Sequence, residues 1–179
     1  GATATTDAEG EFSMAVNVGE DTVVKFSKTG YMETSKLVDI YANVASSVHV
    51  KMAVESVPVV LNADTGGTAT GDANAFITAP ANAFVDGQGN PVTGNVDVHM
   101  TVLDPSDPLE AVAYPGNLLG KTLSGDIVPL RTYGVVDITV RKDGEDMQIK
   151  NGEDVTIGIP ARSLGNTPAT SDMWYFDPD

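Results

Sequence analysis

Apolar and polar residues alternate along most of this chain, which is the pattern of β-strands that bury one face. The pattern predicts four strands within the first 56 residues and at least three in the remainder. Short turn signals that contain Gly10, Gly30 or Asn43 separate the early stripes. The apolar stripes are Phe12, Met14 and Val16; Val24 and Phe26; Val38 and Ile40; Val48, Val50, Met52 and Val54; Val96, Val98, Met100 and Val102; Val136, Ile138 and Val140; and Val155, Ile157 and Ile159.

Helical periodicity is absent from the sequence, since no window of a dozen residues carries apolar side chains at helical spacing. Residues 109–113 have a helical composition, but they end at Tyr114-Pro115-Gly116 and allow one or two turns at most. Strands at regular spacing with turn residues between them predict an all-β chain built of β-sandwiches.

A module boundary is predicted near Ser56, because Pro58 suits a linker or an edge better than a central strand. Residues 1–56 carry 8 acidic and 4 basic side chains, and residues 57–179 carry 17 and 6. We expect two tandem modules, one over 1–56 and one over 57–179. A module of fewer than sixty residues is marginal alone, so the first is expected to be incomplete or to lean on the second.

Composition excludes several classes of function. The 179 residues carry a formal net charge of −15, which disfavours binding to nucleic-acid phosphates or to an anionic membrane surface. The chain contains no cysteine, so disulfide scaffolds, thiolate metal sites and cysteine nucleophiles are excluded. No apolar run is long enough to span a membrane. These features predict an acidic globular protein.

The first module resembles the carboxypeptidase regulatory-like domain. The T-x-D-x-x-G-x-F pattern of that family is matched by Thr5, Asp7, Gly10 and Phe12, and a later G-Y turn is matched by residues 30–31. The resemblance implies a transthyretin-like sandwich over about residues 3–54 that lacks catalytic residues. The opening strands of the family pattern are missing, so the module is expected to lack its N-terminal strands.

The second module resembles the β-sandwich shared by netrin receptors and ankyrins, through Gly66-Gly67 and the P-x-x-A pattern of Pro80 and Ala83. Residues 113–116, 133–138 and 157–160 are similar to bacterial surface proteins and to the cartilage intermediate layer protein group. In that group the two modules occur in tandem. The resemblance implies a secreted, periplasmic or surface-anchored protein, truncated here at its C-terminus.

The two histidines, His49 and His99, both lie on the polar face of a predicted strand. Lone strand histidines far apart in sequence are poor zinc ligands, so we expect solvent-facing residues. The step His99-Met100-Thr101 also resembles the His-Phe-Ser step of self-cleaving relatives of the second module. A hydroxyl next to a base can attack its own backbone, although Met and Thr depart from the motif here. Self-processing at this step is therefore an alternative hypothesis.

The acidic turn of residues 86–90 is similar to half of a calcium loop, but it lacks the closing glutamate. A structural turn before Pro91 is the favoured interpretation, with Ca²⁺ as the alternative. Asp143-Gly144 predicts a hairpin between Val140 and Met147. No catalytic motif is present, so no catalytic, cofactor or metal residue is assigned and the chain is not expected to be an enzyme.

The sequence thus favours a non-enzymatic structural, spacer or adhesive module whose partners are protein surfaces or neighbouring domains. Strands missing from the first module would leave a sheet edge open to another strand or a second copy. A glycan-binding or ligand-binding module is the competing hypothesis, since sugar sites use exposed aromatic side chains. The candidates for that role are Tyr31, Tyr41, Tyr114, Tyr133, Trp174 and Tyr175.

Overall fold

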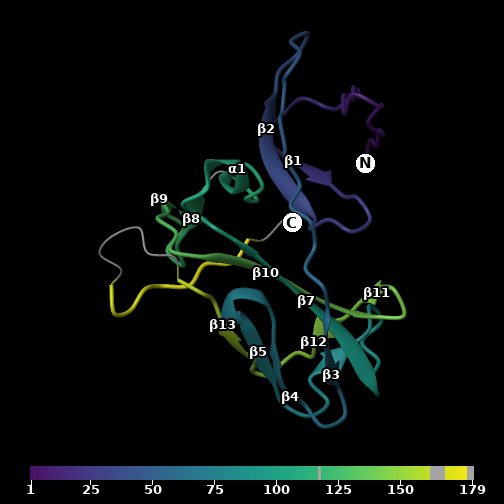
Figure 1. The fold of residues 1–179 in the computed structure, drawn as a ribbon. Helices are drawn as coiled ribbons and strands as arrows, with labels where there is room; N and C mark the ends of the chain where they lie inside the picture. Colours follow the sequence, from purple (N-terminus) through teal and green to yellow (C-terminus); the bar gives the residue numbers. More distant parts are fainter. Residues whose placement is uncertain (117, 162–167, 177–179) are drawn as a thin grey trace.

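The computed structural model describes residues 1–116, 118–161 and 168–176, and it confirms the all-β fold (Figure 1). The first part contains only two strands, and most of the remaining strands belong to a sandwich, while β8 and β9 form a hairpin of their own. The elements in chain order are β1 (Gly19–Phe26), β2 (Thr34–Ile40), β3 (Val59–Asn62), β4 (Gly67–Thr70), η1 (Asp72–Asn74), β5 (Phe76–Ala79), β6 (Phe84–Val85), β7 (Asn95–Leu103), α1 (Pro108–Ala111), β8 (Leu119–Lys121), β9 (Ile127–Pro129), β10 (Val135–Lys142), β11 (Glu145–Asp146), β12 (Gln148–Ile149) and β13 (Thr156–Gly158).

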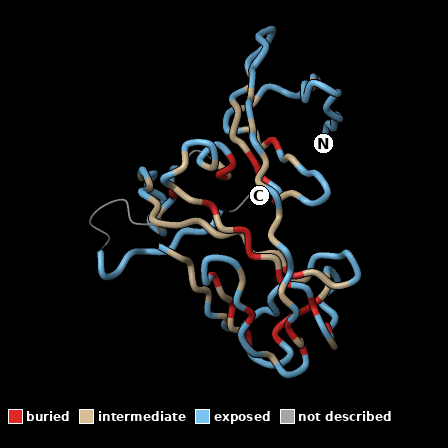
Figure 2. The backbone as a smooth tube through the Cα atoms, viewed as in Figure 1, coloured by how far each residue is buried: buried red, intermediate tan, exposed pale blue. Residues whose placement is uncertain are grey.

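Two antiparallel sheets pack face to face to form the sandwich. One sheet has the order β11-β10-β7-β3, and the other has the order β13-β5-β4. The short pair β12-β6 is a separate two-stranded sheet, and Phe84 of β6 belongs to the same core; β12 lies near β3 and β5 in Figure 1. The alternation in β7 places Val96, Val98 and Met100 in the core. They belong to the same buried cluster as Ile77 of β5 and Phe84 of β6. Buried residues are concentrated there (Figure 2).

The predicted hairpin at residues 143–144 is confirmed. Asp143 and Gly144 take positive φ angles of 53° and 86°, and Lys142 pairs with Glu145 across the turn. Positive φ at both central positions matches the right-handed twist of the flanking strands, which favours Asp-Gly at this place. The hairpin fixes the end of β10 and sends the chain towards β12.

The first part of the chain forms one ladder, in which Val24 of β1 pairs with Lys36 of β2. The prediction of a strand over residues 11–16 is wrong, because these residues pair with no other strand in the described part of the chain. Phe12 nevertheless packs edge-to-face on Phe26, with ring centroids 5.8 Å apart. The strand predicted over residues 48–54 is reduced to a bridge between Tyr31 and Val54. The alternation persists in these segments, but a strand also needs a backbone partner, which periodicity cannot show.

Two sets of contacts join residues 1–56 to the rest of the chain. At the first, the backbone N–H of Gly116 donates to the carbonyl of Ser35 in β2 at 2.9 Å. Thr34 Oγ1 donates to the carbonyl of Ala113 at 2.9 Å, beside a small core that contains Met32 and Leu103. The second set involves the segment that leads from β2 to β3 and forms the site described below.

The segment after β7 follows its sequence signals. Asp107 caps α1 by accepting a hydrogen bond from the backbone N–H of Leu109 at 2.8 Å. The hairpin β8-β9 follows, and Trp174 from the C-terminal segment lies against Gly120, so close that an added Cβ would lie 2.6 Å from the indole. Gly120 therefore leaves the room that the indole ring occupies.

Candidate functional site on the outer face of the sandwich

The face of the β7-β10 ladder that points away from the core is polar. Its cross-strand pairs are Thr101 with Asp137, His99 with Thr139, and Asp97 with Arg141. The alternation in the sequence correctly predicts that these β7 residues lie on the polar face of the strand, and it also predicts that this face is exposed to solvent. Instead Thr101 is 5% exposed, and the side chain of His99 is 13% exposed. Something else in the chain covers them.

The cover is the segment Glu55-Ser56, which crosses the ladder between the first part and β3. The backbone N–H of Met100 donates to Ser56 Oγ at 2.7 Å, and the backbone N–H of Ser56 donates to Thr101 Oγ1 at 3.0 Å. His99 Nδ1 lies 2.9 Å from the carbonyl oxygen of Ser56. These reciprocal contacts hold both the backbone and the side chain of Ser56 on β7.

Glu55 adds charge to the same contact. Its side chain is 9% exposed, and Arg141 Nη1 donates to its Oε1 at 2.5 Å. Its Oε2 lies 3.5 Å from His99 Nδ1, while Arg141 Nε donates to Asp146 Oδ1 at 2.8 Å. We call Glu55, Ser56, His99, Thr101 and Arg141 the polar clamp.

Asp137 lies beside the clamp and responds to its charge. Burial raises the pKa of the Asp137 carboxyl, and the neighbouring Glu55 carboxylate raises it further. Thr139 Oγ1 donates to Asp137 Oδ2 at 3.3 Å, and this hydrogen bond acts in the opposite direction on the pKa. The clamp therefore shelters a carboxyl group that is harder to ionise than an ordinary aspartate.

The predicted site residues have different outcomes. His49 is exposed, as expected. The prediction that His99 faces solvent is wrong, because the segment from residue 55 to residue 56 covers it. Glu55 and Arg141 are the members of the clamp that the sequence analysis did not single out. They are 86 residues apart in the chain, and only the cross-strand register places Arg141 over the linker.

For the self-processing hypothesis, the decisive atoms are the Thr101 hydroxyl and a base. The structure places this hydroxyl as the acceptor of the Ser56 N–H, in a strand that is paired with β10. The imidazole of His99 contacts Ser56 and Glu55. The Thr101 hydroxyl and the His99 imidazole thus both take part in the contact between β7 and residues 55–56.

The acidic turn of residues 86–90 forms a closed turn. Asp86 Oδ1 accepts the backbone N–H groups of Gln88 and Asn90 at 2.9 and 2.8 Å, and the side chain of Asn90 donates to Asp86 Oδ2. These hydrogen bonds, led by that of the Asn90 side chain, lower the pKa of the Asp86 carboxyl. Within the described ranges, no group of three or more His, Asp or Glu residues is arranged to hold a metal ion.

Two of the acidic turns nevertheless come together. One shallow pocket of about 590 Å³ is lined by residues 86–88 of the first turn and by Asp143, Glu145 and Asp146 of the second, together with residues 91–93, Lys142 and Met147. The third acidic segment, residues 104–110, surrounds the start of α1 and belongs to another part of the molecule.

The aromatic residues weighed for glycan binding are dispersed. Tyr114 is buried, Tyr31 lies under the ammonium group of Lys28 at 4.4 Å, and Tyr133 lies near Arg131 at 5.2 Å. Tyr41, which follows β2, and Tyr175, in the C-terminal segment, are exposed. Trp174 is 41% exposed and lies against Gly120.

None of the helices that the structure describes is long and apolar enough to cross a membrane. No protein-family model matches the chain, so its resemblance to carboxypeptidase regulatory-like and netrin-receptor domains stays a prediction. No solved structure matches it either.

Curated relatives do match part of the chain. Human cartilage intermediate layer protein 2 is 30% identical over 94 residues, and the mouse protein of that name is 30% identical over 129 residues, or 68% of this chain. Mouse cartilage intermediate layer protein 1 is 26% identical over 159 residues, or 83% of this chain. The chain covers only 8–13% of the length of these relatives. This all-β chain is therefore similar to a small part of the cartilage intermediate layer proteins, which confirms the resemblance to that group.

Proposed function

We propose that this chain is a non-catalytic structural and interaction module of a larger extracellular protein. The observation that carries the proposal is the polar clamp, which uses the residues best suited to chemistry as a rigid connection between two parts of the chain. Similarity to proteins named for the intermediate layer of cartilage supports an extracellular setting. A module that transmits position or force needs such a fixed connection.

The clamp and the contact between β2 and residues 113–116 fix the first part at two separate places. One contact holds the segment before β3, and the other holds β2 itself. Two separated attachments restrict rotation about the linker, whereas a single attachment would leave a hinge. The module is thus suited to act as a spacer of defined shape.

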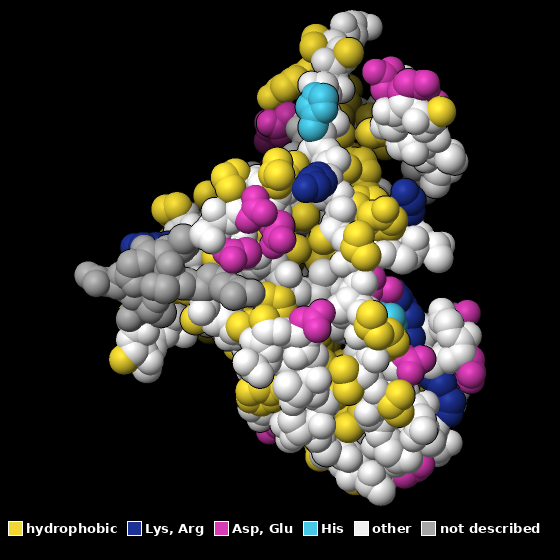
Figure 3. All heavy atoms as spheres, viewed as in Figure 1, with side chains coloured by type: hydrophobic (Ala, Val, Ile, Leu, Met, Phe, Trp, Pro, Cys, Tyr) yellow, Lys and Arg dark blue, Asp and Glu magenta, His cyan; other side chains and the backbone are white. Residues whose placement is uncertain are grey.

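Surfaces for protein partners are present in the first part. Val18, Tyr41 and Val44 are each more than half exposed, and hydrophobic side chains gather over β1 and β2 (Figure 3). The β1-β2 sheet contains only two strands among the described residues. Exposed apolar side chains beside an open sheet edge are features of surfaces that bind another strand. Neighbouring domains, other proteins and a second copy are the partners proposed for it.

The rigid connection is testable by measuring distances between spin labels, because the chain has no native cysteine to interfere. Labels on Ser47→Cys in the first part and Thr70→Cys in β4 should give one narrow distance distribution. The same labels combined with Glu55→Gln and Ser56→Ala should give a broad one. Labels on Thr70→Cys and Thr156→Cys, both within the sandwich, should stay narrow in either background. A broad distribution in the unaltered clamp would refute the proposal.

The two alternatives have direct tests as well. Self-processing requires a mass that corresponds to a break between Met100 and Thr101, so an intact mass after prolonged incubation excludes it. Glycan binding requires a signal on a glycan array that is lost when Tyr41 and Tyr175 are replaced. Sedimentation over a range of concentrations reports whether a second copy binds.

A further inference from the structure

The outer edge of β10 is open. Strand β10 pairs with β7 along residues 135–141, whereas its pairing with β11 on the other side begins only at Arg141. Residues 159–160 pass close to Gly134 at the start of the strand. Among the described residues, the ladder therefore leaves β10 without a neighbouring strand on this side from residue 136 to residue 139.

The direction of its backbone groups follows from one contact. The N–H of Met147 donates to the carbonyl of Val140 at 2.7 Å, so the backbone groups of Val140 point away from β7. In an antiparallel ladder this direction alternates, and Val136 and Ile138 therefore present their N–H and C=O groups on the same outer side. These groups form a ready template for an added strand.

An apolar crevice of about 330 Å³ lies beside this edge, between the two sheets of the sandwich. Ile138 and Val140 line it from β10, and Ile77 and Ile157 line it from the opposite sheet. Ile149, which is 43% exposed, also lines it. An added strand would bury every second side chain here, where the core is incompletely covered.

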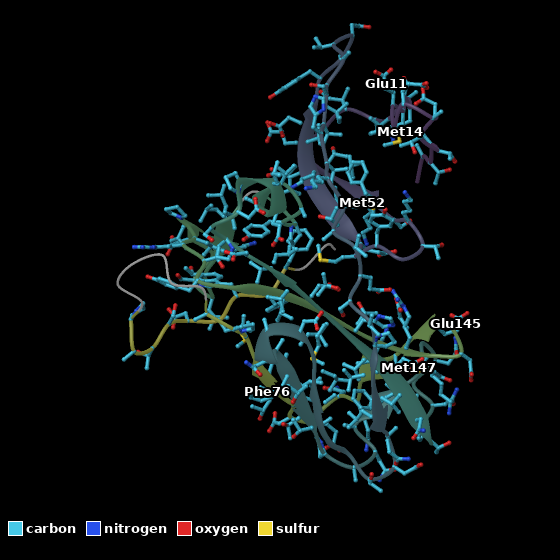
Figure 4. The ribbon with its side chains drawn as sticks, in the orientation of Figure 1. Glu11, Met14, Met52, Phe76, Glu145 and Met147 are labelled. Carbon is cyan, nitrogen blue, oxygen red and sulfur yellow. The ribbon has the colours of Figure 1, made fainter. Side chains whose placement is uncertain are left out.

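The crevice continues into the acidic pocket, because Asp146 and Met147 line both. Met147 lies next to the hairpin that carries Glu145 (Figure 4), and acidic side chains border that hairpin on the surface (Figure 3). The combined groove is apolar along β10 and acidic beyond its C-terminal end. Lys142 is the one basic residue that lines the acidic pocket, and its Nζ donates to the carbonyl of Thr93.

We propose that this groove binds an extended segment of a partner protein, which pairs antiparallel with β10. The segment has apolar residues at alternate positions and lysine or arginine residues at its N-terminal end. Antiparallel pairing places that end over the acidic pocket, at the C-terminal end of β10. A second copy of this chain is disfavoured as the occupant, since its net charge of −15 would meet the acidic rim. The inference deepens the proposed function, because it names the edge and the partner chemistry of that interaction module.

The test uses a fluorescent peptide with three lysines followed by three Val-Thr repeats, and it measures fluorescence anisotropy with the full chain. Two comparison peptides carry three glutamates in place of the lysines, or proline at the central valine. We expect the lysine peptide to bind and to weaken as salt is raised. The glutamate peptide should bind at least tenfold more weakly, and the proline peptide should not bind. Equal binding of the lysine and glutamate peptides, or no binding of the lysine peptide, overturns the proposal.

Two further measurements locate the peptide. The double variant Asp143→Asn/Glu145→Gln should weaken the lysine peptide about tenfold, while Glu9→Gln/Glu20→Gln, with the same change of charge in the first part, should leave it unchanged. On binding, the amides of Val136 and Ile138 should become protected from hydrogen exchange, while those of Asp137 and Thr139 are protected already. Equal losses in both variants, or protection elsewhere, would overturn the assignment to β10. The spin-label distances do not depend on the peptide, so failure here leaves the proposed spacer function standing.

Discussion

Replacing Glu55 with glutamine removes the central charge of the polar clamp while keeping its shape. Glu55 joins Arg141 at 2.5 Å and His99 at 3.5 Å, and its side chain is 9% exposed. We expect Glu55→Gln to destabilise the folded chain, because the Arg141 guanidinium loses its closest carboxylate in a sheltered position. The hydrogen bonds of Ser56 to Met100 and Thr101 would remain, so the attachment would be weakened and not lost.

The magnitude follows from the surroundings of the pair. A hydrogen bond to a charged group contributes about 1.5–3 kcal/mol, and a fully exposed ion pair contributes about 0.2–1 kcal/mol. Arg141 is 27% exposed and keeps its contact with Asp146, and loss of the Glu55 charge also relieves its repulsion of Asp137. The expected loss therefore lies from the top of the lower range to the lower part of the upper one, at about 1–2 kcal/mol.

The assay is urea unfolding followed by far-ultraviolet circular dichroism, with a double-mutant cycle between Glu55→Gln and Arg141→Gln. The cycle isolates the pair from other effects of each substitution. Glu20→Gln is the matched control, since Glu20 is exposed in β1, and a surface change of this kind should stay within about 0.5 kcal/mol. A coupling energy near zero, or equal losses for Glu55→Gln and Glu20→Gln, would show that the clamp does not stabilise the fold.

Three further substitutions test other parts of the structure. Asp137→Asn should raise the urea midpoint at pH 7 and leave it unchanged at pH 3. Burial raises the pKa of Asp137 above its unfolded value, so ionisation of this carboxyl lowers stability as the pH rises from the unfolded pKa to the folded pKa. An equal effect at both pH values would contradict this. Tyr114→Phe should stabilise the chain by about 1 kcal/mol, since the buried hydroxyl has no hydrogen-bond partner among the described residues. In the native chain, ultraviolet absorbance should show this tyrosine ionising with a pKa of about 12, raised first by burial and then by the charges of Asp104 and Glu110. A lower melting temperature for the variant would count against the stability prediction. Gly158→Ala should destabilise by about 1–3 kcal/mol in thermal unfolding, because its Cβ would lie 2.0 Å from the Phe76 ring, and the combination with Phe76→Leu should recover part of the loss.

The sequence determined the strands whose pattern and partners agree. Val96, Val98 and Met100 have the period of a half-buried strand, and they form the centre of the sandwich core. Asp143-Gly144 has a backbone preference that is local, so the hairpin that it predicts forms where it was expected. Such features depend on residues close together in the chain, and side-chain period and turn chemistry reveal them.

The tertiary structure alone decided which strands found a partner and what covered their outer faces. Residues 11–16 and 48–54 alternate as clearly as β7, yet they have no ladder, because hydrogen bonding along a strand requires a neighbour supplied from elsewhere. His99 is polar and was expected in solvent, but the passage of residues 55–56 over β7 buries it. Periodicity reports that a face is polar, whereas only the arrangement of distant segments determines whether water or another part of the chain meets that face.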